Sequence, residues 1–112
     1  MKRDFRREAA LLRVVAHHTR LAILDALSSG PKCVSDVRDL LDIPQPNLSQ
    51  HLAVLRRAGI VDCYEKGKHH CYYIVRPSMA QALMLFLATE CGEDNTAEKP
   101  RRRPAACSLD SR

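Results

Sequence analysis

The stretch of residues 45–59 reads QPNLSQHLAVLRRAG and carries the clearest structural signal in the chain. At about 100° per residue, its leucines fall on one face of a helix, which is therefore predicted to pack inward. These leucines are Leu48, Leu52 and Leu55. The opposite face carries Gln50, Ala53 and Arg57 and so presents hydrogen-bonding and cationic groups.

Both ends of this helix are marked in the sequence. Pro46 suits the first turn, where its missing N–H is not needed, and Gly59 suits the end, because glycine adopts the left-handed conformation at little cost. A helix with one apolar stripe and a polar, cationic outer face is typical of a helix that reads DNA. We call residues 45–59 the reading helix.

Three shorter helices are predicted before it. Apolar residues at helical spacing predict the first from about Arg6 to Ala16, and the second from a capping residue, Thr19, to the break at residues 28–31. A third helix holds the apolar residues of the segment 34–41. The third helix and the reading helix then meet across a tight turn at Ile43-Pro44, as in a helix-turn-helix.

After the reading helix the pattern changes from helix to strand. Residues 60–64 and 68–75 are rich in β-branched and aromatic types, and residues 65–67 join them, which predicts a β-hairpin. Lys66 and Lys68 lie at its tip. The sequence thus predicts a mostly α-helical domain with a hairpin wing.

The segment from Pro77 to Cys91 is apolar almost all round as a helix. One small domain cannot cover such a helix, so we expect a second copy to bury it with help from the first helix. The predicted dimer interface comprises Leu12, Met79, Leu83 and Phe86. Residues 1–91 are therefore interpreted as one domain, and residues 92–112, which lack an apolar pattern, as a disordered basic tail.

Composition sets further limits. The 112 residues carry a net charge of +5, which allows one small domain and favours an anionic partner. No apolar run is long enough to span a membrane, and the N-terminus lacks a signal-peptide core, so we expect a cytoplasmic protein. An enzyme is disfavoured because no nucleophile, base and orienting acid occur together. A protein-interaction module remains an alternative to DNA binding.

Three motifs, in this order, make the chain resemble the ArsR (ArsR/SmtB) family of bacterial winged helix-turn-helix repressors over residues 17–87. They are AHHTRLAIL at 16–24, QPNLSQHL with LRRAGIV between 45 and 61, and Gly67 with Tyr72-Tyr73. The resemblance implies a homodimer that binds an inverted repeat in double-stranded DNA and leaves it when an inducer binds. His18 and Pro44 depart from the family pattern, which usually has proline and a capping serine there.

The DNA contacts are predicted from the chemistry of the side chains. Gln50 can bond an adenine edge and Arg57 a guanine or a phosphate, while lysines of the wing can hold the backbone. The predicted DNA-binding residues are Gln45, Asn47, Ser49, Gln50, Arg57, Lys66 and Lys68. His51 is expected to be half-buried and to bond a neighbouring backbone group. DNA binding needs no cofactor in this interpretation.

The resemblance also suggests places to look for an inducer. The arsenite site that names the family uses Cys-Val-Cys, whereas this chain has Cys33-Val34-Ser35, which leaves one thiolate. The zinc site of other members uses carboxylates and histidines on the last helix, and here Pro77, Met79 and Glu90 stand near those places. We therefore expect neither site in its usual form.

The remaining candidates are the cysteines of the hairpin, Cys63 and Cys71, with Cys33 as a third member. A two-residue turn at Lys66-Gly67 would place Cys63 opposite His70 and point the two thiols to opposite faces. A three-residue turn with a bulge would instead place Cys63 directly opposite Cys71 on one face. Thiolates select soft ions such as arsenite, cadmium or mercury.

Two alternatives to this interpretation stay open. Cys91 and Cys107 form a second candidate pair. The cysteines could also serve a thiol-based redox or sulfide-responsive repressor that needs no metal.

Overall fold

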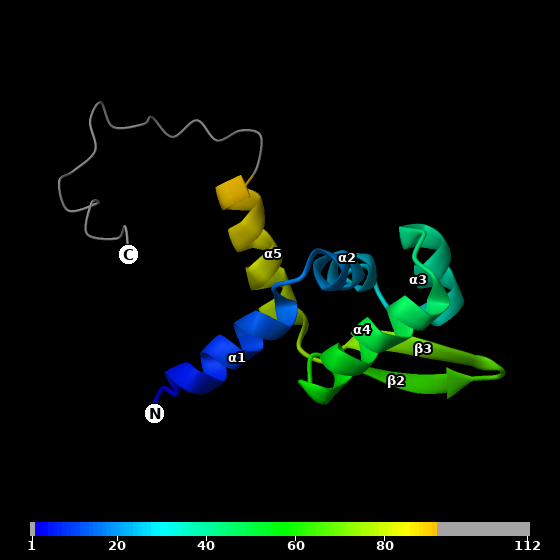
Figure 1. Cartoon of the computed structure of the whole chain (residues 1–112), viewed down its shortest axis with the longest axis horizontal. Helices are drawn as coiled ribbons and strands as arrows, with labels where there is room; N and C mark the ends of the chain where they lie inside the picture. The colour runs from blue at the N-terminus through cyan, green and yellow to red at the C-terminus, as the bar shows by residue number, and fades with distance from the viewer. Residues whose placement is uncertain (1, 92–112) are drawn as a thin grey trace.

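The computed structural model describes residues 2–91, so the interpretation of residues 92–112 lies outside the described part of the chain. The elements are α1 (Phe5–Val15), α2 (His18–Leu27), β1 (Lys32–Cys33), α3 (Val34–Leu41), α4 (Gln45–Arg57), β2 (Val61–Lys66), β3 (His69–Ile74) and α5 (Pro77–Cys91). Figure 1 shows the β2–β3 hairpin projecting beyond the helices as a wing. The predicted fold class, a mostly helical winged helix-turn-helix, is confirmed.

The leucine face of the reading helix forms the centre of the core, as predicted. Leu48, Leu52 and Leu55 of α4 are all at most 1% exposed. Several of the side chains that are buried with them come from α2, from α3 and from the first residue of β2 and the residue before it. These are Ile23, Leu24, Val37, Ile60 and Val61. Burial of a large apolar side chain contributes about 1.5–3 kcal/mol, so this cluster is the main support for the position of α4.

The start of α2 differs from the prediction. His17, and not Thr19, is the N-cap, and its Nδ1 accepts a hydrogen bond from the Thr19 N–H at 3.1 Å. Thr19 lies inside the first turn of α2. The imidazole satisfies an N–H that has no partner within the helix, which is the task a threonine hydroxyl would otherwise perform.

The turn between α3 and α4 contains a residue in the left-handed conformation and a proline. Asp42 ends α3 in the left-handed region, at φ 55°. Pro44 is the N-cap of α4, and Pro46 lies in its first turn. Gly59 follows α4 at φ 78°, where a Cβ would be strained, so both predicted helix ends are confirmed.

The sheet has three strands in the order β1-β3-β2, all antiparallel. The hairpin was predicted, but β1 was not. The two-residue turn is Gly67-Lys68, since Lys66 pairs with His69 and Gly67 has a φ of 63°. A two-residue loop with glycine first matches the right-handed twist of the strands. Both registers considered from the sequence are therefore wrong.

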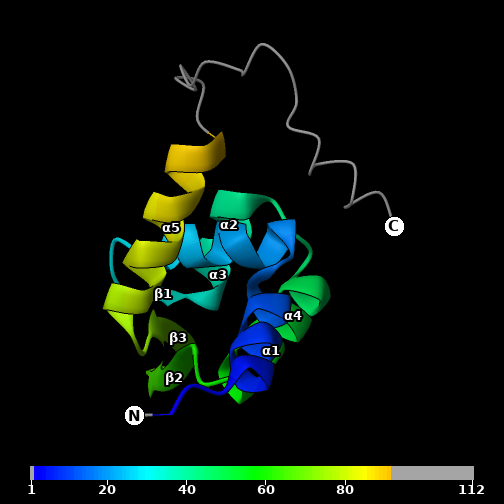
Figure 2. The same cartoon turned by 90° about the vertical axis from the view of Figure 1, so that its left-hand side faces the viewer.

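Helices α1 and α5 lie at the end of the molecule opposite the tip of the wing (Figure 1). In Figure 2, which looks onto this end, both helices stand in front of the other elements. Ala80 of α5 is 2% exposed, and Met79, Leu83 and Met84 pack partly against the core, whereas Phe86 is 60% exposed. Among residues 2–91, no helix is long and apolar enough to cross a membrane.

Candidate nucleic-acid interface and thiol pair

The outward face of α4 presents polar side chains to solvent. Asn47, Ser49, Gln50 and Arg57 are all exposed, in contrast to the three leucines on the other face of the helix. These side chains therefore have the orientation that base or phosphate contact requires. Their role in DNA binding stays a prediction.

Gln45, the first residue of α4, is exposed but already has a partner within the chain. Its Oε1 accepts a hydrogen bond from Nη1 of Arg38 at 2.9 Å, so α3 and α4 are joined at the start of the reading helix. The amide group of Gln45 keeps its NH₂ donors for another acceptor. The same contact holds the Arg38 guanidinium beside the polar face.

Arg20 of α2 is hydrogen-bonded to both α4 and α1. Its Nε donates to Nδ1 of His51 at 3.2 Å, and its Nη1 donates to the carbonyl of Val14 at 3.0 Å. His51 is half-buried as predicted, but its partner is a side chain and not a backbone group. Burial, together with the nearby His17, Arg20 and His18, lowers the pKa of His51 below its usual value. The neutral imidazole is the form that can accept from Arg20.

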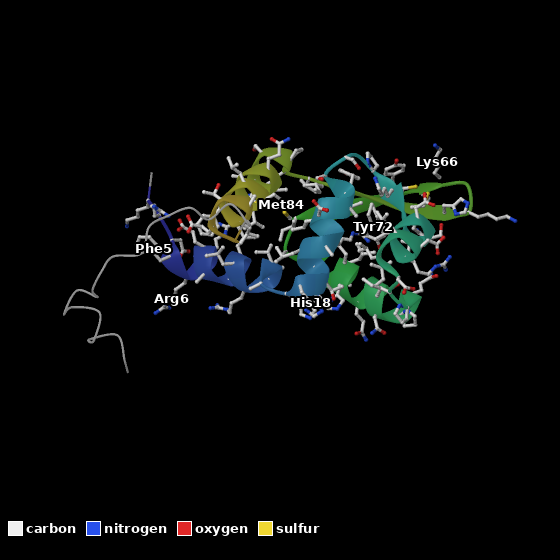
Figure 3. The ribbon with its side chains drawn as sticks, turned by 90° about the horizontal axis from the view of Figure 1, so that it is seen from above. Phe5, Arg6, His18, Lys66, Tyr72 and Met84 are labelled. Atoms are coloured by element: carbon white, nitrogen blue, oxygen red, sulfur yellow. The ribbon has the colours of Figure 1, made fainter. Side chains whose placement is uncertain are left out.

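The tip of the wing carries the predicted cationic contacts. Lys66 and Lys68 are exposed, and Lys66 lies at the opposite end of the molecule from Phe5 (Figure 3). Within the part of the chain that the structure describes, neither lysine forms an ion pair, and nor does Arg57. Their charges are thus available to an anionic partner.

One ion pair joins the wing to the reading helix. Nε of Arg56, near the end of α4, lies 3.1 Å from Oδ1 of Asp62 on β2. Both groups are solvent-exposed, so the contribution to stability is small, on the order of 0–1 kcal/mol. Its effect is to orient Arg56 toward the wing while Arg57 faces away from the core.

The cysteines of the hairpin have other pairing partners than either register considered from the sequence, although their thiols lie on opposite faces as the two-residue turn predicted. Cys63 pairs with Tyr72, and Cys71 pairs with Tyr64. Residues directly opposite in an antiparallel pair share a face, and neighbours along a strand alternate, so Cys63 and Cys71 lie on opposite faces of the sheet. The observed register therefore separates these two thiols.

Cys71 instead lies opposite Cys33 of β1, and the two Sγ atoms are 3.0 Å apart. Cys71 is buried, at 3% exposed, while Cys33 is half-buried. The hydrogen bond between the two thiols, followed by burial, raises the pKa of Cys33 above its usual value, and Asp36 acts in the same direction. We call Cys33 and Cys71 the thiol pair.

Within the described residues, the thiol pair has no larger set of metal ligands around it. Across residues 2–90, whose side chains the structure describes, there is no group of three or more histidine, cysteine, aspartate or glutamate side chains arranged to hold a metal ion. In the thiol pair, the pairing of β1 with β3 brings two sulfur atoms into contact. The second candidate pair from the sequence, Cys91 with Cys107, lies outside the part whose side chains are described.

Three features of this region were missed from the sequence, namely the contact of Arg20 with His51, that of Arg38 with Gln45, and strand β1. The two arginines lie on predicted helices, where a charged residue is usually solvent-exposed, so no sequence pattern indicated these contacts. Strand β1 has only two residues, Lys32 and Cys33, which is too short for an alternating pattern to be visible.

Comparisons with known proteins cover much of this region. The sequence pattern of a family described as "Bacterial regulatory protein, arsR family" matches residues 17–62, from the start of α2 into β2. A biofilm growth-associated repressor of Agrobacterium fabrum is 37% identical over 86 residues, which are 77% of this chain and 74% of the relative. The arsenical resistance operon repressor of Escherichia coli is 42% identical over 59 residues, which are 52% of this chain and 50% of that protein.

Solved structures share the fold as well. The transcriptional repressor BigR from Xylella fastidiosa superposes with a TM-score of 0.68 at 35% sequence identity. The superposition covers 74% of this chain and 84% of BigR.

Proposed function

Because the chain belongs to the ArsR family of bacterial regulatory proteins, we propose that it is a repressor that binds an inverted-repeat operator as a homodimer. Members of this family are DNA-binding transcriptional regulators and not enzymes. The finer parts of the proposal are the contacting residues, the dimer and the inducer. Each is supported by a separate feature of the structure.

The observation that carries DNA binding is the two-sided character of α4. Its apolar face is completely buried, so the helix cannot turn, and Gln50 and Arg57 must face outward. A glutamine can bond an adenine edge in the major groove, and an arginine a guanine or a phosphate. Lys66 and Lys68 lie on the wing beside this helix and can bind the phosphate backbone.

The homodimer is supported by the apolar residues left exposed on α1 and α5. Phe5, Leu12, Leu85 and Phe86 are each 58–70% exposed and come from the two helices at the end away from the wing. A second copy that presents the same surface would cover them. A two-fold pair of reading helices would match the symmetry of an inverted repeat.

For the inducer we propose a thiol-directed agent, with soft ions such as arsenite, cadmium or mercury as the first class to test. One relative is named for arsenical resistance, and thiolates select such ions. The thiol pair supplies two sulfur atoms beside α3 and the wing. Release requires about a hundredfold preference of the inducer for the free protein, or roughly 2.7 kcal/mol.

DNA binding is tested by selecting a preferred duplex from a random pool and then measuring its affinity for variants. Gln50→Ala and Arg57→Ala should each weaken binding by about 1–3 kcal/mol without loss of thermal stability. Gln81→Ala on α5 and Arg13→Ala on α1 are matched exposed controls and should bind normally. A chain that enriches no duplex, or binds without salt dependence, would contradict the proposal and favour a protein-interaction module.

The inducer is tested separately on the selected duplex. Arsenite, cadmium and mercury are each titrated into the complex, and the fraction of bound duplex is measured by fluorescence anisotropy. Release at a few equivalents of ion, reversed by excess dithiol, is the expected result. If all three ions leave the complex intact, the proposal of a soft-ion inducer is wrong while DNA binding still stands.

A further inference from the structure

We propose that Cys33 and Cys71 are a reversible oxidation site at which a hydroperoxide closes a disulfide between β1 and β3, and that closure weakens operator binding. The disulfide rests on the geometry of the sheet alone. Its effect on operator binding rests also on the function proposed above. The chemistry adds one further class to the thiol-directed inducers proposed above, an oxidant.

The backbone holds the thiol pair at the right separation for a disulfide. Cys33 and Cys71 are directly opposite in an antiparallel pair, where Cα atoms are about 4.5–5.5 Å apart. Disulfides need a Cα separation of about 4.4–6.8 Å, so the backbone has no need to rearrange. The Sγ atoms lie 3.0 Å apart, and they must approach by about 1 Å to reach a bond of about 2.05 Å.

The same geometry is less suited to a shared metal ion. An ion held by two thiolates in a line would separate the sulfurs by about 4.6 Å, twice a typical metal–sulfur bond of about 2.3 Å, so the pair would have to open. A tetrahedral ion would need further ligands. The described residues offer no third histidine, cysteine or carboxylate arranged for this. The pair is thus closer to a disulfide than to a metal site.

The burial of the two thiols assigns their order of reaction. Cys33 is half-buried and can meet a small oxidant, whereas Cys71 is buried. The thiolate of Cys33 attacks hydrogen peroxide, an S–O bond forms, the O–O bond breaks, and hydroxide leaves and takes up the thiol proton as water. Cys33 is then a sulfenic acid.

Cys71 completes the reaction. Its sulfur attacks Sγ of Cys33, the S–S bond forms, the S–O bond breaks, and the hydroxyl group leaves with the proton of Cys71 as a second water. Two electrons pass from the two thiols to one peroxide. Because the neighbouring thiol raises the pKa of Cys33, the reaction should become faster as the pH rises.

The position of the pair explains why closure would reach the DNA-binding face. Cys33 is the residue at which β1 ends and α3 begins, and Cys71 lies on β3 of the wing. Both α3 and the hairpin contact the reading helix α4. A bond between Cys33 and Cys71 would therefore fix the wing to the start of α3. The wing could then no longer adjust independently of α3 when Lys66 and Lys68 meet phosphates.

The bond itself is tested on the full-length chain with hydrogen peroxide. Peptide mapping by mass spectrometry should find the Cys33–Cys71 linkage, and dithiothreitol should remove it. Cys33→Ser should abolish this linkage, and Cys63→Ser, a matched cysteine on the other face of the sheet, should leave it intact. Cys71→Ala is a second variant in case serine at Cys33 disturbs the start of α3. An oxidised chain without this linkage overturns the proposal.

The effect on DNA is measured on the same samples. Oxidation should weaken operator binding by between about five- and 150-fold in the native chain and in Cys63→Ser, but not in Cys33→Ser. A linkage that forms without changing affinity overturns the regulatory part. If the reduced chain binds no duplex, the function proposed above has failed, and peptide mapping still decides the disulfide.

Discussion

Helices α4 and α5 are of similar length, 13 and 15 residues, yet they meet their surroundings in opposite ways. Helix α4 has one apolar face, which is fully buried, and one polar face, which is exposed. Helix α5 has apolar residues on nearly every side, and the chain covers only part of them. Ala80 is buried, whereas Leu85 and Phe86 are 69% and 60% exposed.

The difference shows how many of the apolar residues on each helix can be buried within a single chain. The leucines of α4 find their partners within the chain, so its polar face is free for a ligand. The apolar residues of α5 outnumber the partners that the chain provides, and this excess indicates a partner outside it. Substitutions on the two helices should therefore affect different properties, folding and DNA binding for α4 and association for α5.

The largest effect is expected at the buried face of α4. Leu52→Ala should lower the free energy of unfolding by about 2–5 kcal/mol, because it removes a fully buried side chain and leaves a cavity. Chemical denaturation followed by circular dichroism measures it. Gln50→Ala, two positions away on the exposed face, is the control and should stay within about 0.5 kcal/mol of the native chain. Equal losses in both variants would remove the distinction between the faces.

On α5 the expected loss is association and not folding. Phe86→Glu should dissociate the proposed homodimer, because a charge without a partner is costly to bury at an interface, by several kcal/mol. Sedimentation equilibrium measures the mass. Ser78→Glu adds the same charge at the start of the same helix and should leave the dimer intact. Phe86 is a cleaner choice than Leu83, which also packs against the core of its own chain.

Substitutions at the tip of the wing test whether its lysines bind DNA through their charge. Lys66→Ala or Lys68→Ala should weaken binding to all duplex sequences alike and reduce the slope of log K against log salt by about one unit each, because one phosphate contact is lost. Affinity measured at several salt concentrations gives the slope. Lys32→Ala, a lysine on β1, serves as the comparison. A loss confined to one sequence would instead indicate base contact.

The smallest effect concerns the contact of His51 with Arg20. The fold lowers the pKa of His51 below its usual value of 6.5, so the unfolded chain takes up the proton first as the pH falls. This contribution to stability is present above pH 6.5 and is lost below it, toward the lower pKa of the folded state. His51→Gln keeps a neutral acceptor without this titration. The melting temperature of this variant should therefore fall less between pH 7.5 and 5.5 than that of the native chain.

Most of the fold could be predicted from the sequence because its elements have regular periods. The leucine spacing of α4, the proline and glycine at its ends, and the change to β-branched residues after it each have a local physical cause. The helix ends were less predictable. His17 replaced Thr19 as the cap of α2, because an imidazole nitrogen can also accept from a backbone N–H.

One of the two candidate sites could likewise be predicted from the sequence, and the other could not. The exposure of Gln50 and Arg57 follows from helical period, so the sequence alone predicts it. The thiol pair depends on the register of the hairpin and on a strand of two residues, and a shift of one position moves a side chain to the other face. Sequence reasoning identified Cys33 and Cys71 as candidates but could not decide that they meet each other and that Cys63 does not.

Arg20 has a consequence for the spacing of an operator. Its guanidinium bonds both the carbonyl of Val14, at the end of α1, and the imidazole of His51, in the middle of α4. In the proposed homodimer, a tilt of α1 at the two-fold axis would therefore carry α4 with it. B-DNA presents the same groove face about every 34 Å, so a dimer of fixed geometry tolerates one length of spacer between half-sites. Inserting single base pairs into the spacer would measure how stiff this connection is.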